Sequence, residues 1–451
     1  MGVLLAALLA ADTVLVLPFA TKADARAGAG VAVAEVILDV VVQANRDNFL
    51  TLKQLDAALR RRDLQLDDAA VCAHALELAR PLGATDVVLG EVRLEGGQWR
   101  IEAKRLKVAS GKLVKQAAEE GARAAFPTLA HKVALDLFER VRGSPGPLTR
   151  SGVALEEAAL CEAQLARQPL GPRARTALAP DRIASAEKAC KAALQADPML
   201  GLARAGLAVA LAARGKFAQA REQARKAQSR RFVPIAVLAE SFAERKMHGG
   251  KDSRAILERA MIARRGFLHA LGYLAEDRME QGDDEAALAI FDRYLQLSPD
   301  HPWAMGMKGR ELARLGRIDE AIEISERALE LDPGDPELLI ETASRYIDAG
   351  RDARAQPLLE QCLRLATRDE EARTRGMAHA DLAIVHARQE RYADAVAELE
   401  RARAEGNNEL PCDEPELEGW KDQPELREVC VAAEAALADS EADDDAVPVE
   451  L

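Results

Sequence analysis

The stretch that decides the fold is residues 302–335, PWAMGMKGRELARLGRIDEAIEISERALELDPGD, and its direct continuation, residues 336–369, PELLIETASRYIDAGRDARAQPLLEQCLRLATRD. Both segments are 34 residues long, and small residues occupy positions 8, 20 and 27 of each: Gly309, Ala321, Ala328, Ala343, Ala355 and Cys362. A fixed period of this length predicts a solenoid of helical hairpins, because a single hairpin cannot bury its apolar face without neighbours.

The same phase extends outward along the chain. Further units begin at Gly201, Leu268 and Gly376, a degenerate unit begins near Pro234, and an opening unit begins near Ser151. This pattern resembles the tetratricopeptide repeat. The resemblance covers residues 151–409 and implies an all-α superhelix that binds other chains.

The region before the repeats has a different pattern. The sequence predicts, in order, a strand at 13–19, helices at 31–45 and 67–80, strands at 86–94, 98–107 and 112–117, and a helix at 128–141. Gly96 and Gly97 mark a hairpin between two of these strands. Helices followed by a strand meander favour an α/β fold, a small mixed sheet with flanking helices.

Four segments of this region resemble the TolB-like amino-terminal domain: VLVLPF at 14–19, RPLGATDVVLG at 80–90, Arg105-Leu106 and Ser110-Gly111. The chain departs from the family pattern at Thr85, where Asp is frequent, and its 105–111 hairpin is one residue shorter. The resemblance implies an envelope-associated module without catalytic residues.

These observations divide the chain into six parts. We expect a signal peptide at 1–11, although a first helix is the alternative, then the TolB-like domain at 12–142 and a Gly/Pro-rich linker at 143–150. The chain then continues with repeats at 151–409, capping helices at 410–438 and an acidic disordered tail at 439–451.

Composition limits the partners. The formal net charge is −13, which disfavours nucleic acid as a partner. No apolar run is long enough to be a transmembrane segment. A disulfide between Cys412 and Cys430 would suit an exported protein, and Cys161 and Cys190 lie on successive helices and are a second candidate pair.

First-helix positions 2, 5, 9, 12 and 13 of stacked hairpins line the inner wall of the superhelix. We therefore predict a partner-binding groove that includes His269, Glu276, Trp303, Arg310, Arg314, Glu337, Ile340 and Ser344. Trp303 has two interpretations of equal weight: an anchor for the partner, or a side chain packed on the neighbouring hairpin.

Motifs for chemistry are missing from the sequence. Gly28-Ala-Gly30 lacks the third glycine of a dinucleotide site and stands too far after the strand, which favours a flexible loop. We expect no enzyme activity, no cofactor and no metal. The favoured function is a protein- or peptide-binding scaffold of the bacterial periplasm or cell envelope, including one within a membrane-associated complex, with the cytoplasm as the alternative location. The alternative function is a regulatory or transport-associated protein whose α/β domain binds a small ligand and whose repeats relay it.

Overall fold

The computed structural model describes residues 12–26, 28–44, 48–60, 62, 64, 70–138, 146–166, 170, 178–368, 371–418, 420 and 422–445. The expected signal peptide at 1–11 lies outside these residues. The chain forms two compact units, Met1–Ala304 and Met305–Leu451. The first unit contains the α/β region together with the early repeats, so the linker at 143–150 does not mark the boundary between compact units.

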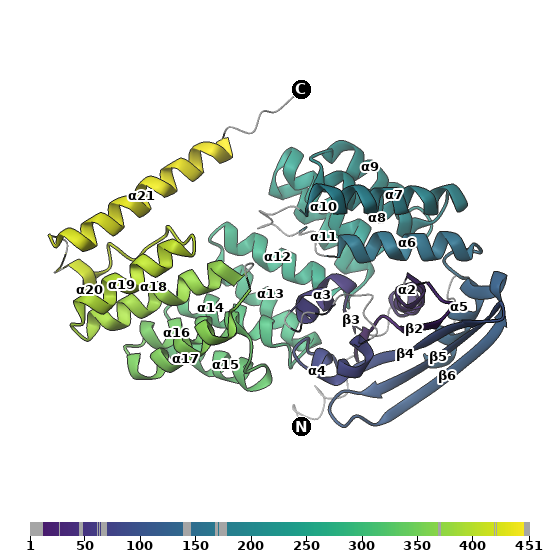
Figure 1. The fold of residues 1–451 in the computed structure, drawn as a ribbon, viewed down its shortest axis with the longest axis horizontal. Coiled ribbons are helices and arrows are strands. Elements are labelled where there is room, and N and C mark those ends of the chain that lie inside the picture. Colours follow the sequence, from purple (N-terminus) through teal and green to yellow (C-terminus); the bar gives the residue numbers. More distant parts are fainter. Residues whose placement is uncertain are drawn as a thin grey trace. The chain divides into compact units, whose positions relative to one another are not determined.

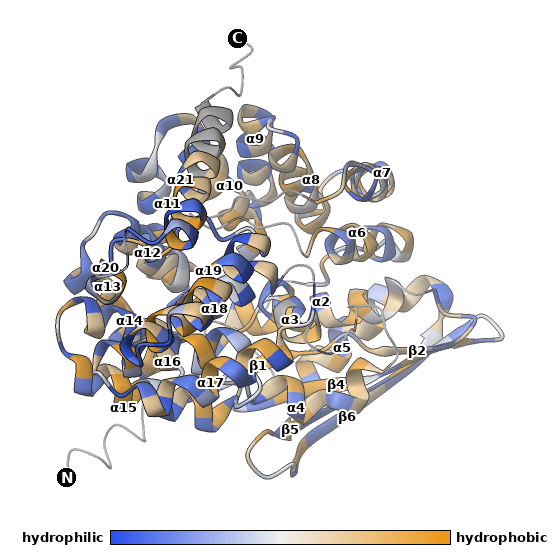
Figure 2. Ribbon diagram, turned by 60° about the vertical axis from the view of Figure 1, so that its left-hand side comes forward, coloured by the Kyte–Doolittle hydropathy of each residue, from blue (hydrophilic) through white to orange (hydrophobic). Residues whose placement is uncertain are grey.

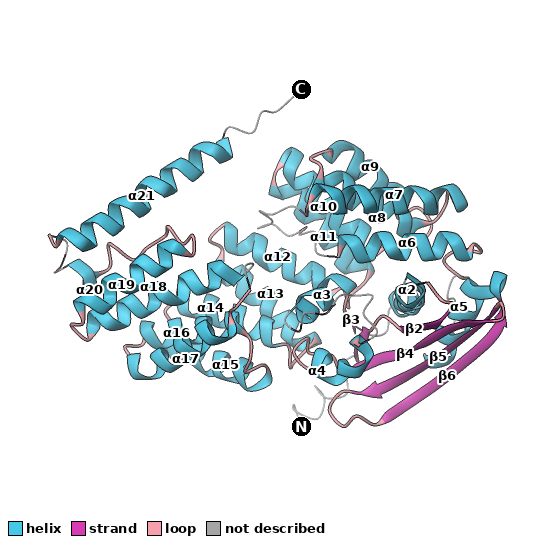
Figure 3. Cartoon of the chain, viewed as in Figure 1, coloured by secondary structure: helices cyan, strands magenta, loops and turns pink. Residues whose placement is uncertain are grey.

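The α/β region contains a six-stranded mixed sheet (Figure 3). Its strands are β1 (Thr13–Val16), β2 (Ala20–Ala23), β3 (Asn48–Phe49), β4 (Asp86–Glu95), β5 (Gln98–Lys107) and β6 (Leu113–Ala122). The order is β3-β1-β4-β5-β6, with β2 also paired to β4. β1, β2 and β4 run parallel, and β4, β5 and β6 form the expected antiparallel meander. This confirms the predicted mixed sheet.

The predicted strand at 13–19 is shorter than expected. β1 ends at Val16, and β2 starts at Ala20 and pairs with a later part of β4. Pro18 interrupts the ladder, since proline has no N–H to donate. The N–H of Phe19 leaves the sheet and donates to the Gly30 carbonyl at 3.1 Å.

The helices of this region also differ in part from expectation. They are α2 (Gly28–Ala44), α3 (Leu52–Arg60), α4 (Ala75–Ala79) and α5 (Phe126–Leu137), with short 3-10 turns at Val71–His74 and Arg123–Ala125. The sequence predicts α2 and α5 but not α3. The predicted helix at 67–80 is reduced to a 3-10 turn and α4, and residues 67 and 68 lie outside the described residues.

The glycines at 28 and 30 are helical, which corrects the prediction of a flexible loop. They form the first turn of α2. A Cβ on Gly30 would lie 1.9 Å from the Phe19 carbonyl oxygen, and a Cβ on Gly28 would lie 2.8 Å from Leu160. Both residues therefore allow close packing of α2, and the helix start is covered by protein instead of opening as a cradle for phosphate.

The described residues that follow this region form mainly helices (Figure 1). In the first unit the helices are α6 (Gly152–Leu165), α7 (Pro180–Ala196), α8 (Gly201–Ala213), α9 (Phe217–Ala227), α10 (Pro234–His248), α11 (Gly250–Ala263), α12 (Leu268–Glu280) and α13 (Asp284–Leu297). α14 (Pro302–Arg314) begins in the first unit and continues into the second. The other helices of the second unit are α15 (Ile318–Leu331), α16 (Pro336–Asp348), α17 (Asp352–Leu365), α18 (Ala372–Arg388), α19 (Tyr392–Ala404), α20 (Pro415–Glu418) and α21 (Pro424–Asp445). Hydrophobic and hydrophilic faces lie side by side on these helices (Figure 2).

The predicted seams are buried. Ala208, Ala275, Ala343 and Ala383 on the first helices, and Ala220, Ala287, Ala321, Ala355 and Ala395 on the second helices, are almost fully inaccessible to solvent. A Cβ on Gly309 would lie 2.5 Å from the Ser325 hydroxyl oxygen. This confirms that small residues at these positions allow the helices of a hairpin to approach.

Position 15 of the repeat is the turn between the two helices. It holds Gly215, Gly282, Gly316 and Gly350, whose φ angles lie between +66° and +77°. The repeat hairpin that begins at Gly376 has Glu390 at this position, with φ +57°. A left-handed conformation costs a non-glycine residue roughly 1–2 kcal/mol, so this hairpin contains a strained turn.

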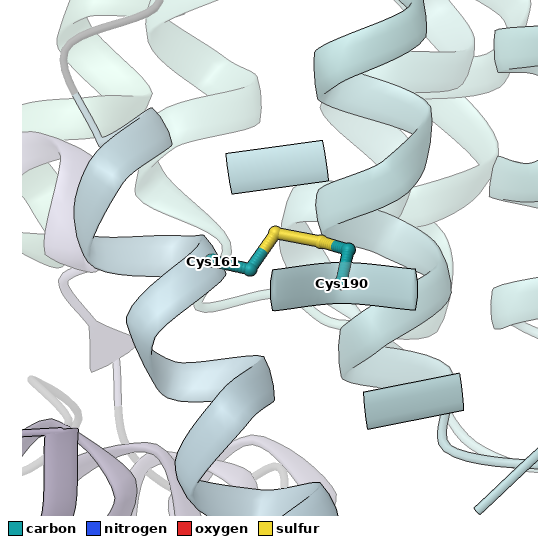
Figure 4. The surroundings of a disulfide bond; sticks show 2 residues. All are labelled: Cys161 and Cys190. Atoms are coloured by element: carbon teal, nitrogen blue, oxygen red, sulfur yellow. A yellow bond between two sulfur atoms is a disulfide. The ribbon is translucent and has the colours of Figure 1, made fainter. Parts of the chain in front are cut away.

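Two disulfides join the cysteine pairs considered above. Cys161 and Cys190 connect α6 to α7 with their Cα atoms 5.4 Å apart (Figure 4). Cys412 and Cys430 connect the segment before α20 to α21 with a Cα separation of 6.0 Å. Cys362 is a buried free thiol and Cys72 is a partly buried one.

The predicted tail at 439–451 is helical as far as Asp445, because α21 continues through the acidic run. The remaining residues, 446–451, lie outside the described residues. The boundary between the capping helices and the tail is therefore later than expected.

Candidate partner-binding surface

In the first unit, the inner face of α12 is covered by the chain itself. His269, at position 2, hydrogen-bonds through Nδ1 with the Thr51 hydroxyl at 2.9 Å. Burial, and secondarily the charge of Lys53, lowers the pKa of His269 to about 3. The imidazole is therefore neutral at physiological pH and is engaged within the protein, not presented to a partner.

A second segment covers the next turn of α12. The backbone of Leu170 hydrogen-bonds with Tyr273, and burial raises the pKa of that phenol far above its usual value. Leu170 belongs to the insertion between α6 and α7, and it is itself buried. Glu276, one turn further along, remains partly exposed. Of the two predicted groove residues of α12, His269 is thus engaged by Thr51, and Glu276 remains partly accessible.

Contacts around β3 hold the α/β region against these repeats. The ring of Phe49 stacks on Phe267 with centroids 5.5 Å apart. The Asn48 amide donates to the Leu297 carbonyl at 2.6 Å, and the Ser298 hydroxyl donates to the Gly83 carbonyl at 3.1 Å. The α/β region is therefore an integral part of the first unit.

Trp303 packs on the neighbouring hairpin. Its ring lies against Gly272 of α12, where an added Cβ would come within 3.1 Å. It also makes edge contacts with Phe291 and Tyr294, with ring centroids 6.0 and 5.8 Å apart. These contacts favour the packing interpretation of Trp303 over the anchor interpretation.

In the second unit, the inner face of α14 and α16 is charged and internally paired. Arg310 donates to Glu341, which also accepts from Arg345 at 2.7 Å. Burial alone would raise the pKa of Glu341, but the two guanidinium groups outweigh burial and lower it. Arg310 is therefore a structural cation that is only partly available to a partner.

One turn further along α16, the Ser344 hydroxyl donates to Asp381 on α18 at 2.6 Å. Burial raises the pKa of Asp381 to about 7, and the hydrogen bond from Ser344 opposes that rise. Ile340 is buried and belongs to the core, which corrects its assignment as a groove residue. Ser344 and Asp381 remain partly exposed.

The most accessible inner-face residues of the second unit are charged. Glu337 is exposed, and the side chains of Arg314 and Asp348 keep 48% and 46% of their accessible surface. The repeat pattern predicts Arg314 and Glu337 as groove residues, and Asp348 occupies inner-wall position 13 of its hairpin. The pattern misses Asp381, which occupies position 6 of its hairpin and is brought to this face by the α16–α18 packing.

Among the described residues, His, Cys, Asp and Glu side chains form no group of three that could hold a metal ion. Within the same ranges, no helix is both long and apolar enough to cross a membrane.

One comparison with known proteins identifies the repeat. The tetratricopeptide repeat family model matches residues 278–339 and 312–374. The chain matches no curated protein. The resemblance of the α/β region to the TolB-like domain remains a prediction.

Solved structures with a related arrangement were also found. A tetratricopeptide repeat protein from Parabacteroides merdae ATCC 43184 is 15% identical over 56% of this chain and 93% of that chain, with a TM-score of 0.40. MamA from AMB-1 is 20% identical over 38% of this chain and 93% of that chain, with a TM-score of 0.30. The APC/C hetero-tetramer Cut9–Hcn1 is 20% identical over 51% of this chain and 42% of that chain, with a TM-score of 0.39.

These TM-scores are too low to carry an argument, so the assignment depends on the family match and on the helical array. The hairpins have the 34-residue period, buried small residues and glycine turns of the repeat. Residues 278–374 are therefore tetratricopeptide repeats.

Proposed function

We propose that this chain is a non-enzymatic scaffold of the bacterial cell envelope that binds a protein or peptide on the inner face of its second unit. The observation that carries the proposal is the contrast in accessibility between the two inner faces. Arg314, Glu337 and Asp348 of the second unit reach solvent, whereas His269 of the first unit is engaged by Thr51.

The partner surface has mixed charge. Arg314 and Glu337 supply one cation and one anion, and Asp348 and Asp381 add carboxylates near Ser344. Exposed charges of this kind contribute more to specificity and association rate than to affinity. The expected partner therefore carries charges of both signs and binds with a salt-dependent rate.

Location in the envelope is supported by the cysteine chemistry. Disulfides persist in oxidising compartments such as the bacterial periplasm and are rare in the cytosol. Two pairs, Cys161–Cys190 and Cys412–Cys430, are bonded here. Sequencing the amino terminus of the mature protein tests export, and a chain that retains residues 1–11 and has reduced cysteines in the cell would contradict it.

Site-specific photocrosslinking in the native cell tests the surface. A crosslinking amino acid placed at Arg314, Glu337 or Asp348 should give discrete adducts. The same amino acid at Glu323 or Glu330, exposed residues of α15 off the inner-wall positions, is the matched control. Equal adducts from both sets, or none from the inner-face set, would reject this surface.

A further inference from the structure

The first unit contains a hollow of about 500 Å³ outside the inner face of the repeats. Its wall consists of the segment 146–150 before α6, the segment between α7 and α8, and the end of α9 with the residues that follow it. The lining side chains include Arg150, Arg230 and Arg231 together with Thr149, Ser229 and Asp197. We propose that this hollow binds a small oxyanion, a molecule that carries phosphate or carboxylate groups.

The three arginines have different roles. Arg231 is fixed: its guanidinium donates to the Asp39 carboxylate at 2.6 Å and to the Gly146 carbonyl at 3.2 Å. These contacts attach the segment before α6 to the loop after α9 and so shape the wall. Arg150 and Arg230 are exposed, and the described residues provide no ion pair or hydrogen bond for either guanidinium.

The two preceding arginines of α9 are paired with carboxylates. Arg221 and Arg225, one to two turns earlier on α9, pair with Glu244 and Glu240 of α10 at 3.2 and 2.8 Å. The chain as a whole has a net charge of −13, so acidic partners are abundant. Arg150 and Arg230 nevertheless face a hollow whose lining contains a single carboxylate, that of Asp197.

Asp197 is already engaged. It accepts from the buried Thr149 hydroxyl at 2.6 Å and from the Met199 N–H at 2.9 Å. These bonds shape the loop between α7 and α8 and leave Arg150 and Arg230 as the donors available to a ligand. The lining therefore combines an excess of positive charge with two unengaged guanidinium groups.

The chemistry of the donors indicates the class of ligand. A guanidinium matches the planar or tetrahedral oxygens of carboxylate and phosphate with paired hydrogen bonds. The volume exceeds that of a bare phosphate ion and falls within the range of small-molecule sites, roughly 300–1,000 Å³. A phosphorylated metabolite and a dicarboxylate both satisfy these requirements.

Isothermal titration calorimetry of the full-length protein with pyrophosphate, glucose 6-phosphate and succinate tests the proposal and distinguishes the two anion types. We expect at least one probe to bind, with an affinity that falls as salt increases. Arg150→Ala and Arg230→Ala should each weaken binding about tenfold or more, and the double variant should abolish it. Arg259→Ala, an exposed arginine of α11 outside the hollow, is the matched control.

Unfolding temperatures of the variants provide the check on folding, since both arginines are exposed. Two results would overturn the proposal. One is the failure of all three probes to bind the wild-type protein at millimolar concentration. The other is an affinity that is equal in the wild type and in the double variant, which would place the anion elsewhere. Neither result bears on the partner surface of the second unit.

Discussion

The two units use the same repeat and differ in how the start of its inner face is covered. In the first unit, Thr51 and Leu170 contact the first turns of α12, and Glu280 at the end of that helix is exposed. In the second unit, the equivalent positions of α16 include Glu337 and Asp348, which reach solvent. The difference indicates that a superhelical groove is not by itself a binding site, because the rest of the sequence decides whether it is filled.

The largest effect is expected where the first unit fills its own groove. Phe49→Ala removes a buried ring that stacks on Phe267 and should destabilise the first unit by about 3–5 kcal/mol. Urea unfolding measures the loss, and hydrogen exchange should show faster exchange in α12. Glu337→Ala on the exposed face should change stability by less than about 0.5 kcal/mol. Unchanged exchange in α12 would contradict the packing described here.

The second prediction concerns pH. Glu162 of α6 is buried with one unpartnered oxygen, and burial raises its pKa from 4.5 to about 7, against the charge of Lys53. Burial also raises the pKa of Glu35 on α2, where the charge of Glu162 adds to the rise. The folded state therefore retains protons that the unfolded chain loses.

Stability of the first unit should be greatest below about pH 4.5 and should fall as the pH rises toward 7, by at most about 3 kcal/mol for Glu162. Glu162→Gln should flatten this dependence when denaturant midpoints are measured between pH 4.5 and 7.5. Asp381→Asn is the corresponding change in the second unit and should leave the first transition unaltered. A wild-type midpoint that does not move with pH would refute the prediction.

The third prediction concerns the first disulfide. A Cβ on Gly206 of α8 would lie 2.6 and 2.7 Å from the sulfurs of Cys161 and Cys190. Gly206→Ala should therefore cost about 1–3 kcal/mol. Gly334→Ala, in open space in the second unit, should be nearly neutral. A double-mutant cycle with Cys161→Ala and Cys190→Ala should show a smaller penalty for Gly206→Ala, and additive costs would argue against the contact.

The smallest effects are expected at position 15 of the repeat, which is glycine in four hairpins and Glu390 in the hairpin that begins at Gly376. Glu390→Gly should stabilise the second unit by about 1 kcal/mol, because glycine accepts the left-handed conformation without strain. Gly282→Ala should destabilise the first unit by a similar amount. Thermal unfolding monitored by circular dichroism measures both. A destabilised Glu390→Gly variant would mean that the glutamate side chain makes a compensating contact.

Sequence reasoning succeeded where the pattern is local. The 34-residue period predicts the small-residue seams at Ala321 and Ala343, because each hairpin specifies its own helix approach. The Gly96-Gly97 hairpin was found for the same reason. These features depend on residues that are close together in the sequence, and a short pattern is therefore enough to predict them.

The sequence pattern does not predict contacts between segments that are distant along the chain. Leu52, Leu55 and Leu59 have the spacing of an amphipathic helix, a signal that would have revealed α3, but nothing in that segment indicates which surface it covers. Thr51 and His269 are 218 residues apart. Position 2 of the repeat predicted a groove residue, and only the tertiary fold decides whether a partner or the chain occupies it.

The disulfides fall within the first and last hairpins of the helical array, and this has a mechanical consequence. Solenoids ordinarily unravel from their ends, where a terminal hairpin has few neighbours; here the first hairpin also packs on α2. Here covalent bonds close loops of 29 and 18 residues at those two places. When the molecule is stretched by force, the two closed loops cannot extend, and the extended chain is shorter by roughly 150 Å. Reduction of the disulfides would add this length.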